Sequence, residues 1–310
     1  MVEISTIIPV RDEEKNLNIL VDRLIKTYEK MKVSYEVIFV TDINEDNTQS
    51  ILEDLSEKIK NIKAIKLSNR FGQHVAVLAG LDHSQGKYTV IMDGDLQDLP
   101  EDIPVLYEKI CEGYDVVYAA KETKNDNCFR NMSSKSFNKI MNFFSDIKID
   151  NNTSMFRIIS RRMQNEIIRY REFEPSLTYI FNLINFPTTK VLVSSGKREH
   201  GNSKYNFGRL INFAISTLLS FSRKPLRMIS GIGSFIALLS FAYLIIVLIQ
   251  YFFFEIEIVG WATLIVIILF TSGVQLLGLG VIGEYIGRIF MQTKNRPLYV
   301  IDKKIGKFDS

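Results

Sequence analysis

The sequence predicts an α/β domain with a mostly parallel sheet, followed by interfacial helices and two transmembrane helices. Short apolar runs rich in β-branched residues alternate with amphipathic segments between residues 4 and 120, and two long uncharged runs follow residue 227. With 310 residues and a formal net charge of +3, the chain is long enough for a complete α/β domain and an additional part.

The expected strands are the apolar runs, and the expected helices are segments with apolar residues at helical spacing. The run ISTIIPV at 4–10 is typical of a buried strand, and NLNILVDRLIKTYEKM at 16–31 of an amphipathic helix. Further strands are expected at 35–42, 62–68, 88–93 and 114–120, and further helices at 48–59, 75–82 and 99–113. This alternation predicts a parallel sheet covered by helices on both faces, with ligands beyond the carboxyl ends of the strands.

Candidate site residues lie at the carboxyl ends of three of the expected strands. They are Pro9, Arg11 and Glu13 after the first, Asp42 after the second, and Asp93 and Asp95 after the fourth. No G-x-G-x-x-G or G-x-x-x-x-G-K-S loop follows the first strand, so the usual backbone cradle for phosphate is missing. A divalent cation such as Mg²⁺ or Mn²⁺ is the expected substitute, because it binds carboxylates and substrate phosphates together.

The segment VIMDGDLQDLPEDI places Asp93 and Asp95 one residue apart at a strand end. A bend at Gly94 would let both carboxylates enter one crevice, with the Gln97 amide oxygen as a third, neutral ligand. Two carboxylates this close repel each other without a cation. For Asp98 and Glu101 we expect a simpler role at the start of the next helix, where acidic groups favour the positive end of the helix dipole.

Two uncharged runs, at 228–254 and 258–283, each exceed the roughly 20 residues that cross a bilayer core. Basic residues precede the first run and follow the second run, whereas the connection between the runs contains Glu255 and Glu257 and no Lys or Arg. The positive-inside rule then predicts cytoplasmic termini. The N-terminus lacks the pattern of a signal peptide. Cys111 and Cys128 show no disulfide or metal spacing, which suits a reducing compartment.

Six stretches in order resemble the polyprenyl-phosphate glycosyltransferases of glycosyltransferase family two, above all the bacterial undecaprenyl-phosphate enzymes, which are related to dolichol-phosphate mannose synthases. The stretches are IIPVRDEEKNL, VTDINEDNT, LSNRFGQHVAVLAGL, MDGDLQDLPEDIP, KREHGNSKY and SRKPLRMISGIGS. The likeness extends over nearly the whole chain. It implies a GT-A fold and transfer of a sugar from a nucleotide sugar, UDP- or GDP-linked, to a polyprenyl phosphate, with Mg²⁺ or Mn²⁺ as cofactor.

The resemblance also implies roles for single residues. The base and ribose pocket would be lined by Pro9, Arg11, Glu13 and Asp42, and the metal would be held by Asp93, Asp95 and Gln97. The donor phosphates would be approached by Lys121, and the lipid phosphate would be bound by Arg198, Ser203 and Lys204. The catalytic residues would be Asp95, Arg198 and Lys204. Arg198, Ser203 and Lys204 belong to a stretch that matches the pattern R-x-x-G-x-S-K-Y.

The chain departs from the family at three positions. Thr41 and Ile43 stand where the family often has an aspartate and a glycine, and Met155 stands where an acid often lies. A lipid phosphate is already ionised near neutral pH, so the acceptor needs little help from a general base. The implied reaction is a single displacement that inverts the anomeric carbon.

The expected organisation is a cytoplasmic GT-A domain at 1–205, an amphipathic interfacial segment at 206–227, two transmembrane helices at 228–283 and a cytoplasmic tail at 284–310. The expected location is the bacterial cytoplasmic membrane, and membrane lipid is an expected partner. The sequence is compatible with a homo-oligomer and does not indicate a nucleic-acid partner. A processive or glycolipid-forming synthase is the alternative, although the Q-x-x-R-W motif and the extra spans of such enzymes are missing. A non-catalytic binding protein is a further alternative, and the intact D-x-D disfavours it.

The charge pattern gives a prediction of topology. Cysteine labelling or reporter fusions should place position 256 outside the membrane and both termini inside, because basic flanks stay in the cytoplasm. A cytoplasmic position 256 would contradict this topology.

Overall fold

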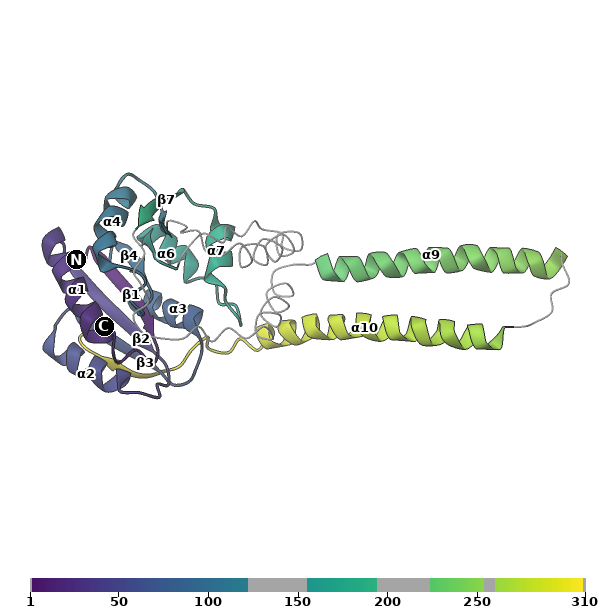
Figure 1. Cartoon of the computed structure of the whole chain (residues 1–310), viewed down its shortest axis with the longest axis horizontal. Coiled ribbons are helices and arrows are strands. Elements are labelled where there is room, and N and C mark those ends of the chain that lie inside the picture. The colour runs from purple at the N-terminus through teal and green to yellow at the C-terminus, as the bar shows by residue number, and fades with distance from the viewer. Residues whose placement is uncertain (1, 122–154, 194–223, 254–259, 309–310) are drawn as a thin grey trace, which may run out of the picture. The chain divides into compact units, whose positions relative to one another are not determined.

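The computed structural model of the chain describes residues 2–121, 155–193, 224–253 and 260–308 (Figure 1). One compact unit contains the described residues up to 193 together with 296–308, and a second unit contains the described residues of 224–295.

The first unit is built on an eight-stranded sheet in the order β7-β5-β6-β4-β1-β2-β3-β8. Its strands are β1 (Ile4–Val10), β2 (Tyr35–Thr41), β3 (Ile62–Leu67), β4 (Tyr88–Ile91), β5 (Val116–Lys121), β6 (Arg157–Ser160), β7 (Thr188–Val193) and β8 (Ile301–Ile305). Strand β1 pairs in parallel with both β2 and β4, and β2 with β3. Strand β6 is antiparallel to β4 and β5, and β8 is antiparallel to β3. The expected α/β fold with a mostly parallel sheet is confirmed.

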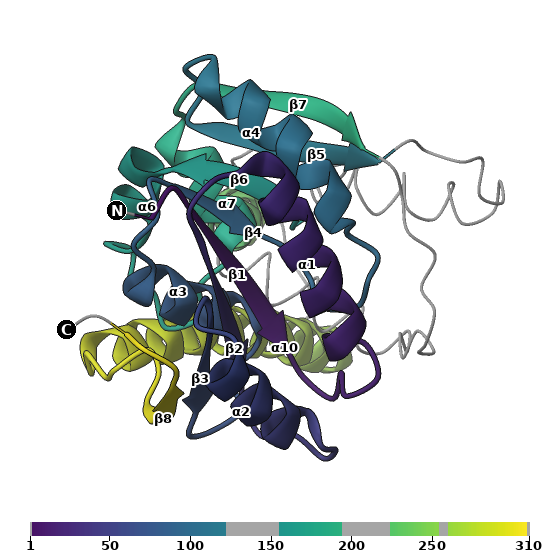
Figure 2. The same ribbon diagram turned by 90° about the vertical axis from the view of Figure 1, so that its left-hand side faces the viewer.

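Helices cover both faces of this sheet (Figure 2). They are α1 (Leu17–Met31), α2 (Thr48–Lys58), α3 (Gln73–His83), α4 (Ile103–Cys111) preceded by a 3-10 turn η1 (Pro100–Asp102), α6 (Arg161–Ile167) and α7 (Leu177–Ile184). Neighbouring strand residues point to opposite faces, so Ile8 joins the core under α1, α2 and α4 whereas Ile7 joins the core under α3, α6 and α7. The five strands and four helices expected up to residue 120 are confirmed to within a few residues at each end.

A buried ion pair lies at the amino ends of the strands. Lys63 Nζ is 2.7 Å from Glu36 Oε2, and the two side chains are 8% and 2% exposed. The Ser5 hydroxyl and the Gln85 backbone N–H also donate to Glu36. A buried charge is tolerated when it is paired and hydrogen-bonded in this way. Glu36 is the second residue of β2, so this network lies at the edge of the sheet opposite to the strands' carboxyl ends.

The C-terminal tail contributes strand β8, which the sequence did not indicate. The Ser68 backbone N–H donates to the Val300 carbonyl at 2.9 Å, and Lys66 Nζ is 2.7 Å from Asp302. Upstream of the strand, the Tyr299 hydroxyl donates to Asp82 of α3. Strand β8 therefore covers the edge of β3 that would otherwise present unpaired backbone groups.

The second unit contains two long helices, α9 (Lys224–Phe253) and α10 (Trp261–Thr293). Both are long and apolar enough to cross a membrane, over Leu226–Tyr243 and Ile267–Thr293. Helix α10 continues ten residues past the expected end at Gly283. It stops where Asn295 takes the left-handed conformation, φ 47°, and Pro297 cannot continue a helix. Of the expected interfacial segment, residues 206–223 lie outside the described ranges.

Candidate functional site

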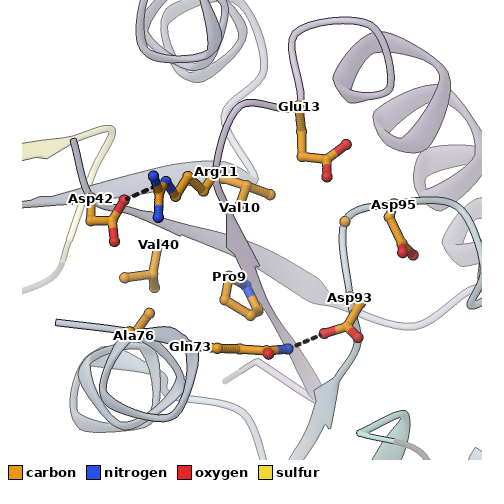
Figure 3. Close-up of a pocket in the computed structure, with 12 residues that line it drawn as sticks. Pro9, Val10, Arg11, Glu13, Val40, Asp42, Gln73, Ala76, Asp93 and Asp95 are labelled. Atoms are coloured by element: carbon orange, nitrogen blue, oxygen red, sulfur yellow. Dashed lines mark hydrogen bonds and ion pairs between the residues drawn. The ribbon is translucent and has the colours of Figure 1, made fainter. Parts of the chain in front are cut away.

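A cavity of about 350 Å³ opens at the carboxyl ends of β1, β2 and β4 (Figure 3). Its lining comes from the end of β1, the end of β2, the start of α3 and the turn after β4. The lining residues are Pro9, Val10, Arg11, Glu13, Val40, Asp42, Gly72, Gln73, Ala76, Asp93, Gly94 and Asp95. This is the edge of a parallel α/β sheet where ligands bind. It brings together six of the predicted site residues, Pro9, Arg11, Glu13, Asp42, Asp93 and Asp95.

The acidic loops after β1 and β2 hold each other by hydrogen bonds from backbone N–H groups to side-chain oxygens. Asp12 Oδ1 accepts the Glu45 N–H at 2.7 Å, and Asn44 Oδ1 accepts the Asp12 N–H at 3.1 Å. Asp46 Oδ2 accepts the Glu14 N–H in the same way. Carboxylates satisfied by backbone N–H groups keep their negative charge at low cost. Asp12 and Asp46 therefore fix the two loops.

Arg11, Glu13 and Asp42 are the polar residues of these loops that line the cavity. Figure 3 shows the Arg11 guanidinium directed at Asp42, with Nε 3.9 Å from Oδ1. Glu13 accepts a hydrogen bond from Asn16 Nδ2 at 2.5 Å. Burial raises the pKa of the Asp42 carboxyl, although the charges of Arg11 and Arg70 oppose that rise. Asp42 Oδ1 is buried without a hydrogen-bond partner, which leaves an acceptor for a ligand N–H or O–H.

Thr41 and Ile43, two of the positions where the sequence differs from the family pattern, lie on either side of Asp42. The Thr41 side chain is buried, and its hydroxyl oxygen accepts from Asn44 Nδ2 at 2.7 Å, so this residue belongs to the turn. Ile43 is 43% exposed. Asp42 is consequently the acid of this loop that lines the cavity.

The turn after β4 carries Asp93 and Asp95. A Cβ at Gly94 would lie 2.7 Å from Val10 Cγ1, so only glycine lets the turn pass this close to β1. Leu96 takes the left-handed conformation at φ 63°, which costs about 1–2 kcal/mol for a residue with a side chain. Its side chain is 3% exposed and packs in the core, which holds the strained turn in place.

Each aspartate of the turn is hydrogen-bonded. Gln73 Nε2, at the start of α3, donates to Asp93 Oδ1 at 2.5 Å (Figure 3). Gln97 donates to Asp95 twice, from the backbone N–H at 3.1 Å and from Nε2 at 2.9 Å. Gln97 is thus attached to Asp95, but it is not among the cavity-lining residues. Gln73 was missed as a site residue, and the only available signal was its place within the stretch LSNRFGQHVAVLAGL.

Asp98 does more than precede a helix. Its side chain is buried, and Oδ2 accepts the Asp93 N–H at 3.1 Å. Glu101 fits the simpler expectation, because it lies in the first turn before α4 and pairs with Arg23 at 2.6 Å on the surface. In the sequence these two acids look alike. Tertiary burial separates them, since Asp98 points inward under the turn that carries the two aspartates.

The other predicted site residues are not placed in the cavity. Lys121 ends β5, and its side chain lies outside the described part of the structure. Arg198, Ser203 and Lys204 belong to 194–223, which the structure does not describe. Their assignment to the lipid phosphate remains a prediction.

The donor atoms of the cavity fit a hard divalent cation that is shared with a ligand. Within the described residues, no group of three or more His, Cys, Asp or Glu side chains could hold a metal ion alone. Asp93 and Asp95 nevertheless supply two carboxylates to one cavity. Mg²⁺ is commonly bound by one or two carboxylates with substrate phosphates and waters completing its coordination. A cation here would depend on a phosphate-bearing ligand.

Comparison with known proteins identifies the class. Residues 5–168 match glycosyl transferase family 2, and residues 224–289 match the GtrB C-terminal hairpin. The chain belongs to the family-2 glycosyltransferases.

Relatives over the full length place it more narrowly. The chain is 38% identical to an uncharacterised glycosyltransferase of Synechocystis sp., over 98% of this chain and 96% of the relative. It is 34% identical to an undecaprenyl-phosphate 4-deoxy-4-formamido-L-arabinose transferase of Pectobacterium atrosepticum, over 98% and 94%. The chain is a member of the polyprenyl-phosphate sugar transferase group within that family.

Solved structures confirm the GT-A-like fold. Glucosyl-3-phosphoglycerate synthase from Mycobacterium tuberculosis, in complex with Mn²⁺, UDP and phosphoglyceric acid, superposes with a TM-score of 0.51 at 18% identity, over 71% of this chain and 78% of that one. A mannosyltransferase from Pyrobaculum calidifontis, in complex with GDP-Man and Mn²⁺, superposes with a TM-score of 0.50 at 14% identity, over 70% and 63%.

The partly buried side chain of Asp42 yields a prediction with two measurements, thermal stability and nucleotide binding. Folding raises the pKa of Asp42, so the ionised carboxylate destabilises the folded state at any pH above the folded-state pKa. This penalty decreases as the pH falls through the folded-state pKa and is absent below the unfolded-state pKa. Asp42→Asn should leave the melting temperature at pH 7 unchanged or higher, while nucleotide binding weakens about tenfold, since the substitution removes a charged hydrogen bond.

Thermal unfolding and nucleotide titration measure both effects. Asp54→Asn is the control, because Asp54 pairs with Lys58 on the surface. Unchanged binding of UDP and GDP by the Asp42→Asn protein would contradict the expectation that Asp42 contacts a nucleotide.

Proposed function

We propose that this protein transfers a sugar, with inversion, from a UDP- or GDP-linked donor to a polyprenyl phosphate such as undecaprenyl phosphate at the cytoplasmic face of a bacterial membrane. The product would be a polyprenyl-phosphate sugar used to modify a cell-envelope glycan or lipid. The observation that carries the proposal is the joint placement of Asp42, Asp93 and Asp95 in one cavity at the carboxyl ends of β1, β2 and β4.

The donor would lie along this cavity. The Asp42 carboxylate is suited to accept a hydrogen bond from a base N–H or a ribose hydroxyl, and the neighbouring Arg11 guanidinium stabilises its ionised form. Pro9 and Val40 supply apolar walls, and Glu13 offers a further acceptor. The diphosphate would extend toward Asp93 and Asp95, with Lys121 contributing a positive charge from the end of β5.

Asp93 and Asp95 are the residues that would hold Mg²⁺ or Mn²⁺, and the Gln97 side chain donates a hydrogen bond to Asp95. Bound there, the cation would supply charge neutralisation for the departing nucleoside diphosphate. The protein's own contribution is to keep the two carboxylates in a fixed turn before any ligand arrives. Such preorganisation avoids the cost of arranging the site during transfer.

The acceptor explains how the chemistry tolerates Met155. A phosphate monoester of a lipid is ionised near neutral pH, so it can attack the anomeric carbon without losing a proton. The demand is to bring two anions into line, which cationic side chains can meet. Arg198 and Lys204, with Ser203 as a hydrogen-bond donor, are the residues proposed for this task.

The membrane helices follow from the same acceptor. A polyprenyl tail remains in the bilayer, so its phosphate must be met at the interface. Helices α9 and α10 would anchor the catalytic unit there, and the segment before α9 would lie in the interface with its apolar residues toward lipid. Basic flanks at both ends of the helix pair support cytoplasmic termini.

The metal assignment predicts the behaviour of Asp95→Asn. We expect sugar transfer to fall below about one hundredth of wild type, because the substitution removes one of two metal-binding charges, while the melting temperature stays near that of wild type. Radiolabelled UDP- and GDP-sugars with undecaprenyl phosphate in detergent measure the transfer. Glu101→Gln is the control, since Glu101 is an exposed acid outside the cavity. Full activity of the Asp95→Asn protein at saturating Mn²⁺ would contradict the assignment.

The acceptor assignment predicts that Lys204→Ala impairs use of the lipid more than use of the nucleotide sugar. If Lys204 binds the lipid phosphate equally in the ground and transition states, its removal raises KM for the lipid; if the interaction strengthens during transfer, kcat falls as well. Separate titrations of lipid phosphate and nucleotide sugar distinguish these cases. Kinetics within about twofold for both substrates would indicate a solvated surface lysine. An effect confined to the nucleotide sugar would move Lys204 to the donor site.

A further inference from the structure

Arg157 is a fully buried cation beneath the candidate site. It begins β6, where it pairs with Ile91 of β4 on one side and with Tyr118 of β5 on the other. Its side chain is 1% exposed. Ile91 is the last residue of β4, and Asp93 follows two positions later. Arg157 therefore lies on the strand adjacent to β4, and β4 leads directly into the turn that carries Asp93 and Asp95.

The side chain is fixed in one orientation. Its Cζ lies 4.5 Å from the centre of the Phe181 ring and 4.9 Å from that of Tyr118, so aromatic faces hold the guanidinium. Nε donates to the Met155 carbonyl at 3.1 Å, and Nη2 lies 3.6 Å from the Met155 sulfur. Met155 thus gives Arg157 a carbonyl and a thioether, and neither group carries a negative charge.

The carboxylates that act on this cation belong to the turn after β4. Burial lowers the pKa of Arg157, and favourable electrostatic interactions with Tyr118, Asp93 and Asp98 oppose this effect. Asp98 is itself buried and accepts the Asp93 N–H. Burial also lowers the pKa of His74, the residue after the glutamine that bonds Asp93, and the Arg157 charge lowers that pKa further. The guanidinium is thus within electrostatic reach of the elements that position Asp93.

A buried cation is costly unless negative charge compensates it. Asp98 and Asp93 supply that charge, and Arg157 in return reduces the repulsion that Asp93 and Asp95 would exert on each other. The turn also contains the strained Leu96, so it needs support from the core below it.

We propose that Arg157 is a positioning residue that, together with Asp98, holds the Asp93–Asp95 turn ready for a divalent cation. The inference rests on the proposed metal-dependent transfer and deepens it. Arg157 does not touch the cation or the donor. It acts through the carboxylate of Asp93 and through the buried Asp98.

The test measures Mn²⁺ binding directly. Free Mn²⁺ is followed by electron paramagnetic resonance with the detergent-purified full chain, with Mn²⁺ alone and with UDP or GDP added. Arg157→Met should raise the dissociation constant for Mn²⁺ by about tenfold or more, because removal of a group that orients a metal ligand typically costs 10–100-fold in affinity. Arg157→Lys should give an intermediate value, because the charge stays while the planar fork is absent.

Lys63→Met is the matched control. Lys63 is also a buried cation with a carboxylate partner, but it lies at the amino ends of the strands. Its removal should lower the melting temperature and leave the Mn²⁺ dissociation constant within about twofold, as expected for independent sites. A purely structural role for Arg157 would give the same result as Lys63→Met.

The outcomes separate this inference from the proposed function. If the wild-type chain binds Mn²⁺ and transfers sugar while a folded Arg157→Met protein binds Mn²⁺ like wild type, the positioning role is wrong and the proposed function stands. If the Arg157→Met protein does not fold, Arg157→Lys decides, and unchanged Mn²⁺ binding by that variant overturns the inference. If wild type transfers sugar but binds no Mn²⁺ with either nucleotide, the metal site and the positioning role both fail. Absence of transfer with every donor and lipid offered would count against the proposed function itself.

Discussion

Repulsion among carboxylates is the constraint on which the arrangement of the site depends. Asp42, Asp93 and Asp95 converge on one cavity because β1, β2 and β4 run in parallel and end at the same edge of the sheet. Like charges gathered in one cavity repel one another and tend to push apart the loops that carry them. The chain counters this with donors, Gln73 on Asp93 and Gln97 on Asp95. At Asp42 burial raises the pKa of the carboxyl, the charges of Arg11 and Arg70 offset only part of that rise, and the cavity is therefore suited to cations and hydrogen-bond donors.

The acids around the site divide into two groups that the sequence does not distinguish. Asp12 and Asp46 stabilise the two loops, because their carboxylate oxygens accept hydrogen bonds from backbone N–H groups of the facing loop. Asp93 and Asp95 lie in a turn that glycine and a strained leucine hold against β1. The first group makes the cavity rigid, and the second gives it charge. A rigid, charged cavity suits a transfer reaction that consists largely of positioning two anions.

The two long apolar helices and the sheet are connected through the C-terminal part of the chain. After α10 the chain supplies Tyr299, which bonds Asp82 of α3, and then β8, which pairs with β3. The edge of β3 is thereby covered, and the loop between β3 and α3 is held at Ser68 by the Val300 carbonyl. That loop leads to Gly72 and Gln73, which line the cavity. The tail thus belongs to the same compact unit as the sheet, although the three consecutive charged residues of IDKKI gave no sign of a strand.

The sequence by itself determined the alternation of strands and helices up to residue 120, the two apolar helices and the strand-end positions of Arg11, Asp42, Asp93 and Asp95. These follow from local periodicity and from the rule that parallel strands end together. Only the tertiary structure decided that Asp98 turns inward, that Gln73 reaches Asp93 from another element, that Arg157 lies beneath them and that β8 closes the sheet. Each of these depends on contacts between residues far apart in the chain, and a single sequence carries no periodic signal for such contacts.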